Sequence, residues 1–114
     1  MNQSKHDLLQ GTLDLLILKI LSIGQLHGWD ISKRIQLVSK EQLMVKQGSL
    51  YPALHRLEQK AWIEAEWGIS EAGRSAKFYQ LTDLGRKQMK EETARWESFV
   101  ESVSLILRID KAIQ

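Results

Sequence analysis

The apolar pattern at the C-terminal end of the sequence is too long for a small domain to cover. Thr82 suits the N-cap of a helix and Asp83 suits its first turn, so we expect a helix from about 83 to 109. At about 1.5 Å per residue, this helix is roughly 40 Å long. Its apolar stripe consists of Met89, Trp96, Phe99, Val100, Val103, Ile106, Leu107 and Ile113. Such a stripe needs another helix to bury it, and the same helix of a second copy is available, so the sequence predicts a homodimer.

The composition narrows the class of protein. The 114 residues are enough for one domain with an appended helix. The absence of cysteine excludes a disulfide framework, a thiolate metal site and a cysteine nucleophile. No stretch approaches about 18 consecutive apolar residues, and no signal peptide precedes the first expected helix. A soluble cytoplasmic protein is therefore expected.

The charges are unevenly distributed although the formal net charge is only +2. Residues 27–60 carry six Lys and Arg against three acids, and residues 74–90 carry five against one. Residues 61–73 and 91–110 each sum to −3. A chain with this distribution can direct a positive surface toward an anion and turn its acidic segments elsewhere.

Two helices are expected in the first third of the chain. Residues 4–23 form the first, because Ser4 and Asp7 resemble a capping box and Gly24 suits its end. Its wide apolar stripe consists of Leu9, Leu13, Leu16, Ile17, Ile20 and Leu21. A stripe this wide predicts burial on two sides, in the core and against a second subunit.

The second helix is expected over residues 28–39. Its inward positions are predicted to be Ile31, Ile35 and Val38. Lys33 and Arg34 are expected to face outward, and His27 before the helix is interpreted as a hydrogen-bonded structural histidine. The segment that follows has room for a short strand at 43–45.

The stretch 46–62, KQGSLYPALHRLEQKAW, predicts a short third helix with two contrasting sides. Leu50, Leu54 and Leu57 recur at helical spacing and form the apolar side. Ser49 is expected to cap the helix, and Pro52 is expected in its first turn, where a missing N–H is tolerated. The polar side suits a helix that reads the major groove of DNA, but any surface helix has the same pattern.

The hydrophobic period changes to that of a strand after Trp62. Ile63, Ala65 and Trp67 alternate with acidic residues, and 76–82 is a second strand candidate after the turn-like segment 68–75. A hairpin after helices in this order is the layout of a winged helix. Trp29, Trp62 and Trp67 are accordingly expected to be core or wing-packing residues.

Five segments together resemble the PadR family of bacterial transcriptional regulators, over about residues 8–107. They are LLQGTLDLLILKIL (8–21), LHGWDIS (26–32), GSLYPALHRLE (48–58), WI (62–63) and FYQLTDLG (78–85). The resemblance implies a mainly α fold with a small β-wing: a winged helix-turn-helix domain over 1–82 and a dimerisation helix over 83–114. It also implies a dimeric repressor that binds double-stranded DNA, with two recognition helices in successive major grooves of a palindromic operator.

The resemblance also assigns expected roles to residues. The expected DNA-binding residues are Ser49, Tyr51, Pro52, His55, Arg56, Gln59, Arg74 and Lys77. The expected dimerisation residues are Leu9, Leu13, Leu16, Trp96, Phe99, Val100, Val103, Ile106 and Leu107. Trp96 also falls in a region that lines a cavity for flat hydrophobic effectors in some family members. Glu71 departs from the family pattern, in which the wing is often more basic.

Several residues have competing interpretations. Arg56 suits a bidentate contact to guanine, but a phosphate or solvent contact fits it equally well. Tyr51 is either a phosphate donor or a half-buried packing residue, and Trp96 is either interface packing or a pocket wall. His55 and Glu58 are too few ligands to make a metal site convincing.

Two functional classes remain to be compared with a DNA-binding regulator. An enzyme is disfavoured because no nucleophile, base and acid are sensibly spaced and no phosphate loop is present. No cofactor is expected. A winged-helix module that docks onto a protein fits the near-neutral charge, and it predicts no salt-dependent binding to DNA.

Overall fold

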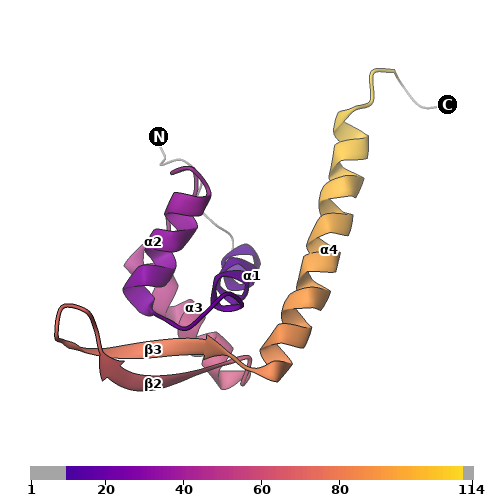
Figure 1. Cartoon of the computed structure of the whole chain (residues 1–114). Coiled ribbons are helices and arrows are strands. Elements are labelled where there is room, and N and C mark those ends of the chain that lie inside the picture. Colours follow the sequence, from indigo (N-terminus) through magenta and orange to yellow (C-terminus); the bar gives the residue numbers. More distant parts are fainter. Residues whose placement is uncertain (1–9, 112–114) are drawn as a thin grey trace.

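The computed structural model describes residues 10–111. Helices precede Trp62 and a hairpin follows it, as the hydrophobic period predicts (Figure 1). A two-residue strand that the period did not predict lies between the first two helices. The elements are α1 (Gln10–Leu21), β1 (Leu26–His27), α2 (Gly28–Val38), α3 (Gln47–Gln59), β2 (Ile63–Ile69), β3 (Ser75–Leu81) and α4 (Asp83–Leu107). The predicted mainly α fold with a small β-wing and a long C-terminal helix is confirmed. Within the described range, no helix is long and apolar enough to cross a membrane.

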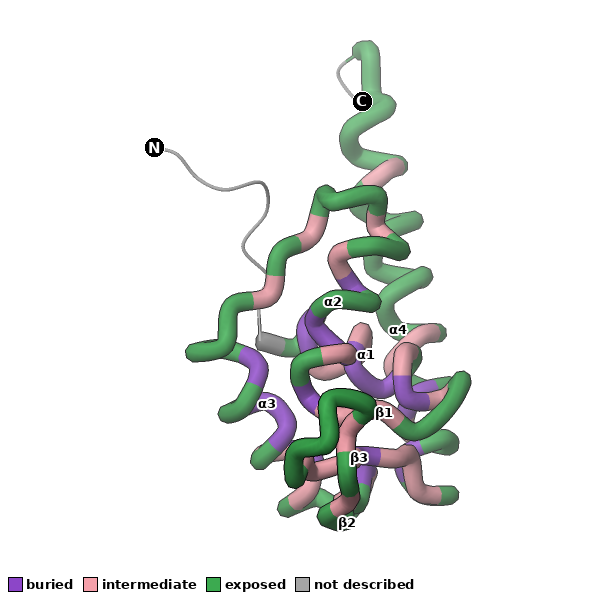
Figure 2. Tube along the Cα trace, turned by 60° about the vertical axis from the view of Figure 1, so that its left-hand side comes forward, coloured by how far each residue is buried: buried purple, intermediate pink, exposed green. Residues whose placement is uncertain are grey.

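The core lies where α1, α2 and α3 meet the base of the hairpin (Figure 2). α1 packs against α2, α3 and α4, so it is the central helix of the fold. Its Leu13, Ile17 and Leu18 are buried, and the apolar sides of α2 and α3 pack on the same cluster. The residues with almost no exposed side chain are Ile17, Leu18, Ile31, Leu50, Leu54, Leu57 and Ile63.

The sheet is antiparallel, with the strand order β1-β3-β2. β2 and β3 form the hairpin, in register from Ile63 opposite Leu81 to Ile69 opposite Ser75. β1 adds Leu26 opposite Tyr79. This two-residue strand brings the start of α2 next to the hairpin, which places α2 beside the wing.

The junction between α3, the hairpin and α4 is held by backbone hydrogen bonds. α3 ends with Trp62 N–H donating to the Leu57 carbonyl and Ala61 N–H donating to the Glu58 carbonyl, which is a Schellman motif with Ala61 at φ 62°. The Thr82 hydroxyl donates to the carbonyl of Ala61 at 2.7 Å and accepts from the Gly85 N–H at 2.9 Å. Thr82 therefore caps α4, as predicted.

α4 extends beyond the core, as the length of its apolar stripe predicts (Figure 1). The described chain measures 63 × 35 × 20 Å along its principal axes. Near the start of α4, Gly85 and Met89 are buried, whereas Figure 2 shows the helix exposed along most of its length. Its large exposed apolar residues are Leu84, Trp96, Phe99, Val100, Val103, Leu105, Ile106 and Leu107.

Several local predictions differ from the structure. α1 ends at Leu21, before Gly24, and residues 43–45 form no strand element. Val38 was expected to face inward, but its side chain is 72% exposed because the core ends at Ile35, one turn earlier. Leu9 and Ile113, together with the predicted start of the first helix at residue 4, lie outside the described residues.

The dimerisation prediction for α1 also needs correction. Leu13 is buried in the core of a single chain, so it offers no surface to a second subunit. Leu16 is partly buried and packs against the same core. Of these two helices, α4 carries the large exposed apolar residues, and the described turns of α1 carry none.

Candidate nucleic-acid interface

α3 has one buried side and one exposed side, because its leucines repeat at helical spacing. The buried side consists of Leu50, Ala53, Leu54 and Leu57. The exposed residues on the rest of the helix surface include Ser49, Tyr51, Pro52, His55 and Gln59. These five predicted DNA-binding residues therefore share an accessible surface that carries hydroxyl, imidazole and amide groups.

The start of α3 is different from the predicted one. The helix begins at Gln47 with Lys46 as N-cap, and the cap makes no side-chain hydrogen bond. The expected cap, Ser49, is instead the third helical residue, and its hydroxyl is exposed. Pro52 is the sixth and lies inside the helix, where it removes the hydrogen bond that a residue at this position would donate to the Gly48 carbonyl.

Arg56 does not lie on the exposed side as predicted. Its Nη2 donates to Oδ1 of Asp14 on α1 at 2.8 Å, and its Nε is buried without a partner. The position of Arg56 next to Leu57 and Ala53 turns its side chain into the contact between α3 and α1. Arg56 is therefore not the freely exposed cation that the sequence predicted.

The two predicted cations of the hairpin have different surroundings. Arg74 is exposed in the turn between β2 and β3, where Gly73 adopts φ 78° and Ser70 N–H donates to the Arg74 carbonyl at 2.8 Å. Lys77 on β3 donates to Oε1 of Glu58 on α3 at 3.2 Å and lies over the ring of Tyr79. Arg74 is available to a ligand, whereas Lys77 ties the hairpin to α3.

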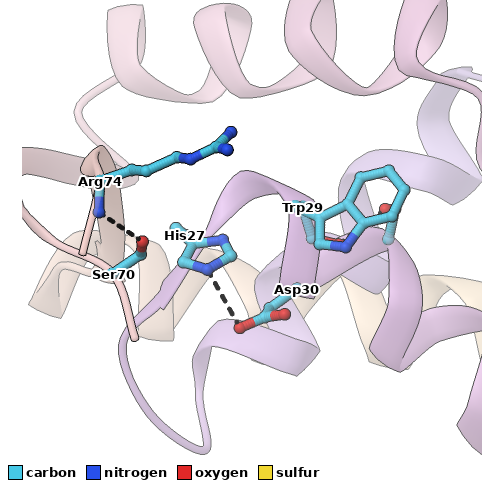
Figure 3. A network of polar contacts seen from close by, with 6 residues as sticks. His27, Trp29, Asp30, Ser70 and Arg74 are labelled. Atoms are coloured by element: carbon cyan, nitrogen blue, oxygen red, sulfur yellow. Dashed lines mark hydrogen bonds and ion pairs between the residues drawn. The ribbon is translucent and has the colours of Figure 1, made fainter. Parts of the chain in front are cut away.

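A cleft of about 1130 Å³ lies between α2, the first turns of α3 and the outer half of the hairpin. Figure 3 shows Arg74 extending from the turn toward the space beside His27 and the first turn of α2. The cleft is lined by the cations Lys33, Arg34, Arg74 and Lys77, by the aromatic residues Trp29, Tyr51, Trp67, Phe78 and Tyr79, and by the acids Asp30 and Glu71, among others. It is a concave surface with cations on both walls, one wall formed by α2 and the other by the wing.

Trp29 and Trp67 do not lie in the core, which was one of the two roles predicted for them. Their side chains are 54% and 70% exposed, and both line the cleft. Trp67 continues the inward side of β2 beyond the point where Ile63 ends the core. Only Trp62 packs partly against the core, with the Lys60 ammonium 4.6 Å from its ring centroid.

The α2 wall of the cleft contains no residue for which the sequence predicted a DNA-binding role. Lys33 and Arg34 are exposed, as predicted. The sequence does contain a signal for this surface. Trp29, Lys33 and Leu37 recur every four residues, on a side of α2 away from Ile31 and Ile35.

His27 and Tyr79 also line the cleft. His27 Nε2 lies 3.4 Å from Oδ2 of Asp30 (Figure 3). The His27 ring also contacts Phe78 edge-on, which agrees with a structural role. Burial raises the pKa of the Tyr79 phenol above 10.0, and the nearby Glu58 carboxylate raises it further. Tyr79 is therefore a neutral packing residue at physiological pH.

Potential metal ligands are dispersed over the described residues. Among residues 10–111, no three potential His, Asp or Glu ligands come together in a group that could hold an ion. The neighbouring pair His55 and Glu58 belongs to different environments, since Glu58 bonds to Lys77 and His55 is exposed. The arrangement instead suits contacts to an extended anion.

Known proteins resemble this chain in sequence. Residues 17–91 match the Transcriptional regulator PadR-like family. Uncharacterized protein X of Lysinibacillus sphaericus is 30% identical over 103 residues, which cover 90% of this chain and 94% of that protein. Negative transcriptional regulator PadR of Bacillus subtilis is 28% identical over 91 residues, which cover 80% of this chain and 50% of that protein.

Solved structures resemble this chain in fold. The structure of smu.1704 from Streptococcus mutans has a TM-score of 0.81 at 27% identity, covering 97% of this chain and 100% of that one. The PadR-like transcriptional regulator BC4206 from Bacillus cereus has a TM-score of 0.76 at 29% identity, covering 89% and 96%. The similarity to both structures extends over most of each chain.

Proposed function

The chain belongs to the PadR-like family of transcriptional regulators, and from this premise we propose that it is a dimeric, sequence-specific DNA-binding protein that represses a nearby promoter. The observation that carries the proposal is the shared surface of α3 and the cleft beside it. The exposed side of α3 continues through Tyr51 into a concave surface with cations on both walls. A helix beside a cationic cleft suits a major groove and its flanking phosphate backbone.

The residues divide into two proposed roles. Ser49 and Tyr51 lie at the start of α3, where hydroxyl donors suit phosphate oxygens, and Pro52 contributes an apolar contact beside them. His55 and Gln59 lie further along the exposed side, where side chains reach base edges. Lys33, Arg34 and Arg74 would contact the backbone from the two walls of the cleft, and Lys77 would act by holding the hairpin on α3.

Dimerisation through α4 follows from the exposed apolar stripe. Trp96, Phe99, Val100 and Val103 are spaced by three and four residues, so they lie on one side of the helix. A second α4 packed on this stripe would remove it from water. The two recognition helices must then be separated by about 34 Å to enter successive major grooves of B-DNA.

The same stripe provides the proposed effector site. The rings of Trp96 and Phe99 are adjacent, with centroids 6.2 Å apart and planes 39° apart. Between two copies of α4, such rings would form walls for a flat hydrophobic molecule. The molecule would relieve repression if it favoured a dimer whose recognition helices no longer match the operator.

The experiment that tests the proposal is a mobility-shift titration with DNA from upstream of the protein's own gene, in the presence of excess unrelated DNA. Wild-type protein should form a competitor-resistant complex. His55→Ala and Gln59→Ala should each lose specificity, with a cost of about 1–3 kcal/mol. Arg74→Gln should weaken binding to every sequence, whereas Lys87→Gln, which removes the same charge from α4, should have little effect.

Failure of the proposal has a distinct signature. If a verified dimer binds neither this DNA nor random genomic fragments, the proposal of a DNA-binding function is wrong. Docking onto a protein then becomes the better hypothesis. Weak binding that is equal for every fragment would exclude repression of its own gene. Sedimentation of wild type and Phe99→Glu checks the dimer separately, and only the wild type should be dimeric.

A further inference from the structure

An ion pair joins the recognition helix to the central helix of the fold. Arg56 Nη2 donates to Asp14 Oδ1 at 2.8 Å, across 42 residues of sequence. The side chains of Arg56 and Asp14 are 29% and 13% exposed, so Asp14 is largely removed from solvent and Arg56 is partly removed. Charge-assisted hydrogen bonds in such surroundings have strong directional preferences, and they fix the positions of both groups.

The pair lies between the two parts of the molecule that DNA binding must coordinate. α1 packs against α3 on one side and against α4 on another. Asp14 follows the core residue Leu13 on α1, and Arg56 precedes the core residue Leu57 on α3. Any change in the Arg56–Asp14 contact would therefore alter how α3 is set relative to α1, and through α1 relative to α4.

The geometry also argues against Arg56 leaving Asp14 to contact DNA. Its Nε is buried in the contact between α3 and α1, and only part of the side chain reaches solvent. Withdrawal of Arg56 would leave the largely buried Asp14 carboxylate without its cation. An unpaired buried charge of this kind is strongly unfavourable.

We propose that Arg56 is a positioning residue, which sets the orientation of α3 through Asp14, and that it does not read bases. This inference rests on the proposed DNA-binding function. It assigns a functional role to Asp14, an acidic residue that electrostatics alone would class as unfavourable for DNA binding. Together, Arg56 and Asp14 set the specificity of the exposed side of α3 without contacting the operator.

The substitution Asp14→Asn distinguishes direct DNA contact by Arg56 from positioning of α3 by the pair. The two roles predict changes in DNA affinity of opposite sign. If Arg56 read bases or phosphates, removing Asp14's charge would free the arginine and reduce repulsion, so DNA would bind more tightly. If the pair positions α3, the same substitution misplaces His55 and Gln59 and weakens specific binding. Non-specific binding depends on phosphate contacts and should stay nearly constant.

The test uses the full-length protein and a duplex enriched by the wild type from a random DNA pool. Fluorescence anisotropy gives the Kd for this duplex and for an unrelated duplex. The variants are Asp14→Asn, Arg56→Gln, the double substitution and Arg56→Lys, with Glu91→Gln on the exposed surface of α4 as the control for removing an acid. Circular dichroism confirms that each variant is folded at the temperature of the binding assay.

Positioning predicts that Asp14→Asn and Arg56→Gln each lower the ratio of specific to non-specific affinity by about tenfold, the effect of losing about one base contact. The double substitution should be no worse than either single one, because both break the same link. Arg56→Lys should recover part of the loss, and the salt dependence should be unchanged in all variants.

Other results overturn the inference. Asp14→Asn binding the enriched duplex as tightly as wild type, or more tightly, would show that the pair does not position α3. A reduced salt slope in Arg56→Gln with no loss in Asp14→Asn would identify Arg56 as a direct DNA contact. If the wild type enriches no duplex at all, it is the proposed DNA-binding function that fails.

Discussion

Tyr51 on α3 packs against Gly28 at the start of α2 so closely that a Cβ at position 28 would lie 2.9 Å from the Tyr51 hydroxyl oxygen. Gly28→Ala should therefore displace the phenol, which is partly exposed and free to swing. An alanine suits a helix, so we expect the free energy of unfolding to change by less than about 1 kcal/mol. DNA affinity should fall by about tenfold if the displaced hydroxyl donates to a phosphate.

Tyr51→Phe is the control for this prediction, because it removes the hydroxyl and keeps the ring. The double variant Gly28→Ala, Tyr51→Phe should bind DNA no more weakly than Tyr51→Phe alone. Additive losses in an anisotropy titration would show that position 28 acts by another route.

Gly85 allows α4 to begin directly against the end of α3. A Cβ at this position would lie 1.9 Å from the Trp62 carbonyl oxygen, which also accepts a hydrogen bond from the Thr82 hydroxyl at 3.0 Å. Gly85→Ala should lower the free energy of unfolding by about 2–3 kcal/mol, measured in urea at one fixed protein concentration. Gly11→Ala, at a position in α1 where a Cβ would meet nothing within 4 Å, should be neutral or stabilising.

Ala61 is an alanine in a backbone conformation that favours glycine. Its φ of 62° lies in the left-handed region, where the Schellman motif at the end of α3 requires it. Ala61→Gly should raise the free energy of unfolding by about 0.5–1 kcal/mol. An unfolding midpoint equal to or below that of wild type would contradict this account of the helix end.

Tyr79 should make stability depend on alkaline pH. Burial, and then Glu58, raise its pKa above the ordinary value of 10.0 in the folded chain. The folded state therefore holds the phenolic proton more tightly than the unfolded chain does. Its stabilising contribution is complete below pH 10.0 and is lost as the pH rises above that value.

Urea unfolding of wild type and Tyr79→Phe at about pH 9 and about pH 11 isolates this effect. Wild type should lose more stability between the two values than the phenylalanine variant, which has no proton to release. Parallel losses would show that Tyr79 does not contribute to the pH dependence.

Local pattern was enough to predict most of the fold. The spacing of Leu50, Leu54 and Leu57 identified α3, and Thr82 marked the start of α4. These signals are local because the apolar spacing and the capping residue of a helix are read from residues close together in the sequence. β1 is too short to show a period. Leu26 is in a strand only because it pairs with Tyr79, more than 50 residues later.

The candidate site was harder to predict because it depends on where the core ends. Periodicity placed Trp67 on the inward side of β2, but the structure shows that this side continues beyond the core into the cleft. Arg56 shows that a side chain's partner can also lie far away in the sequence. Its place in the sequence suggested a free cation on α3, and only the packing of α1 on α3 reveals Asp14 as its partner.

The salt dependence of DNA binding tests the central claim most directly. Wild type should be titrated into operator DNA at about 50 and about 200 mM salt, beside the cleft variant Lys33→Gln, Arg34→Gln, Arg74→Gln and a control with Arg86, Lys87 and Lys90 of α4 changed to Gln. We predict that wild-type affinity falls by about 10³ or more between the two salt concentrations. The cleft variant should bind weakly with a flatter slope, whereas the α4 control should follow the wild type. A cleft variant indistinguishable from the α4 control, or wild-type binding that does not depend on salt, would contradict the claim that α3 and the cleft hold DNA.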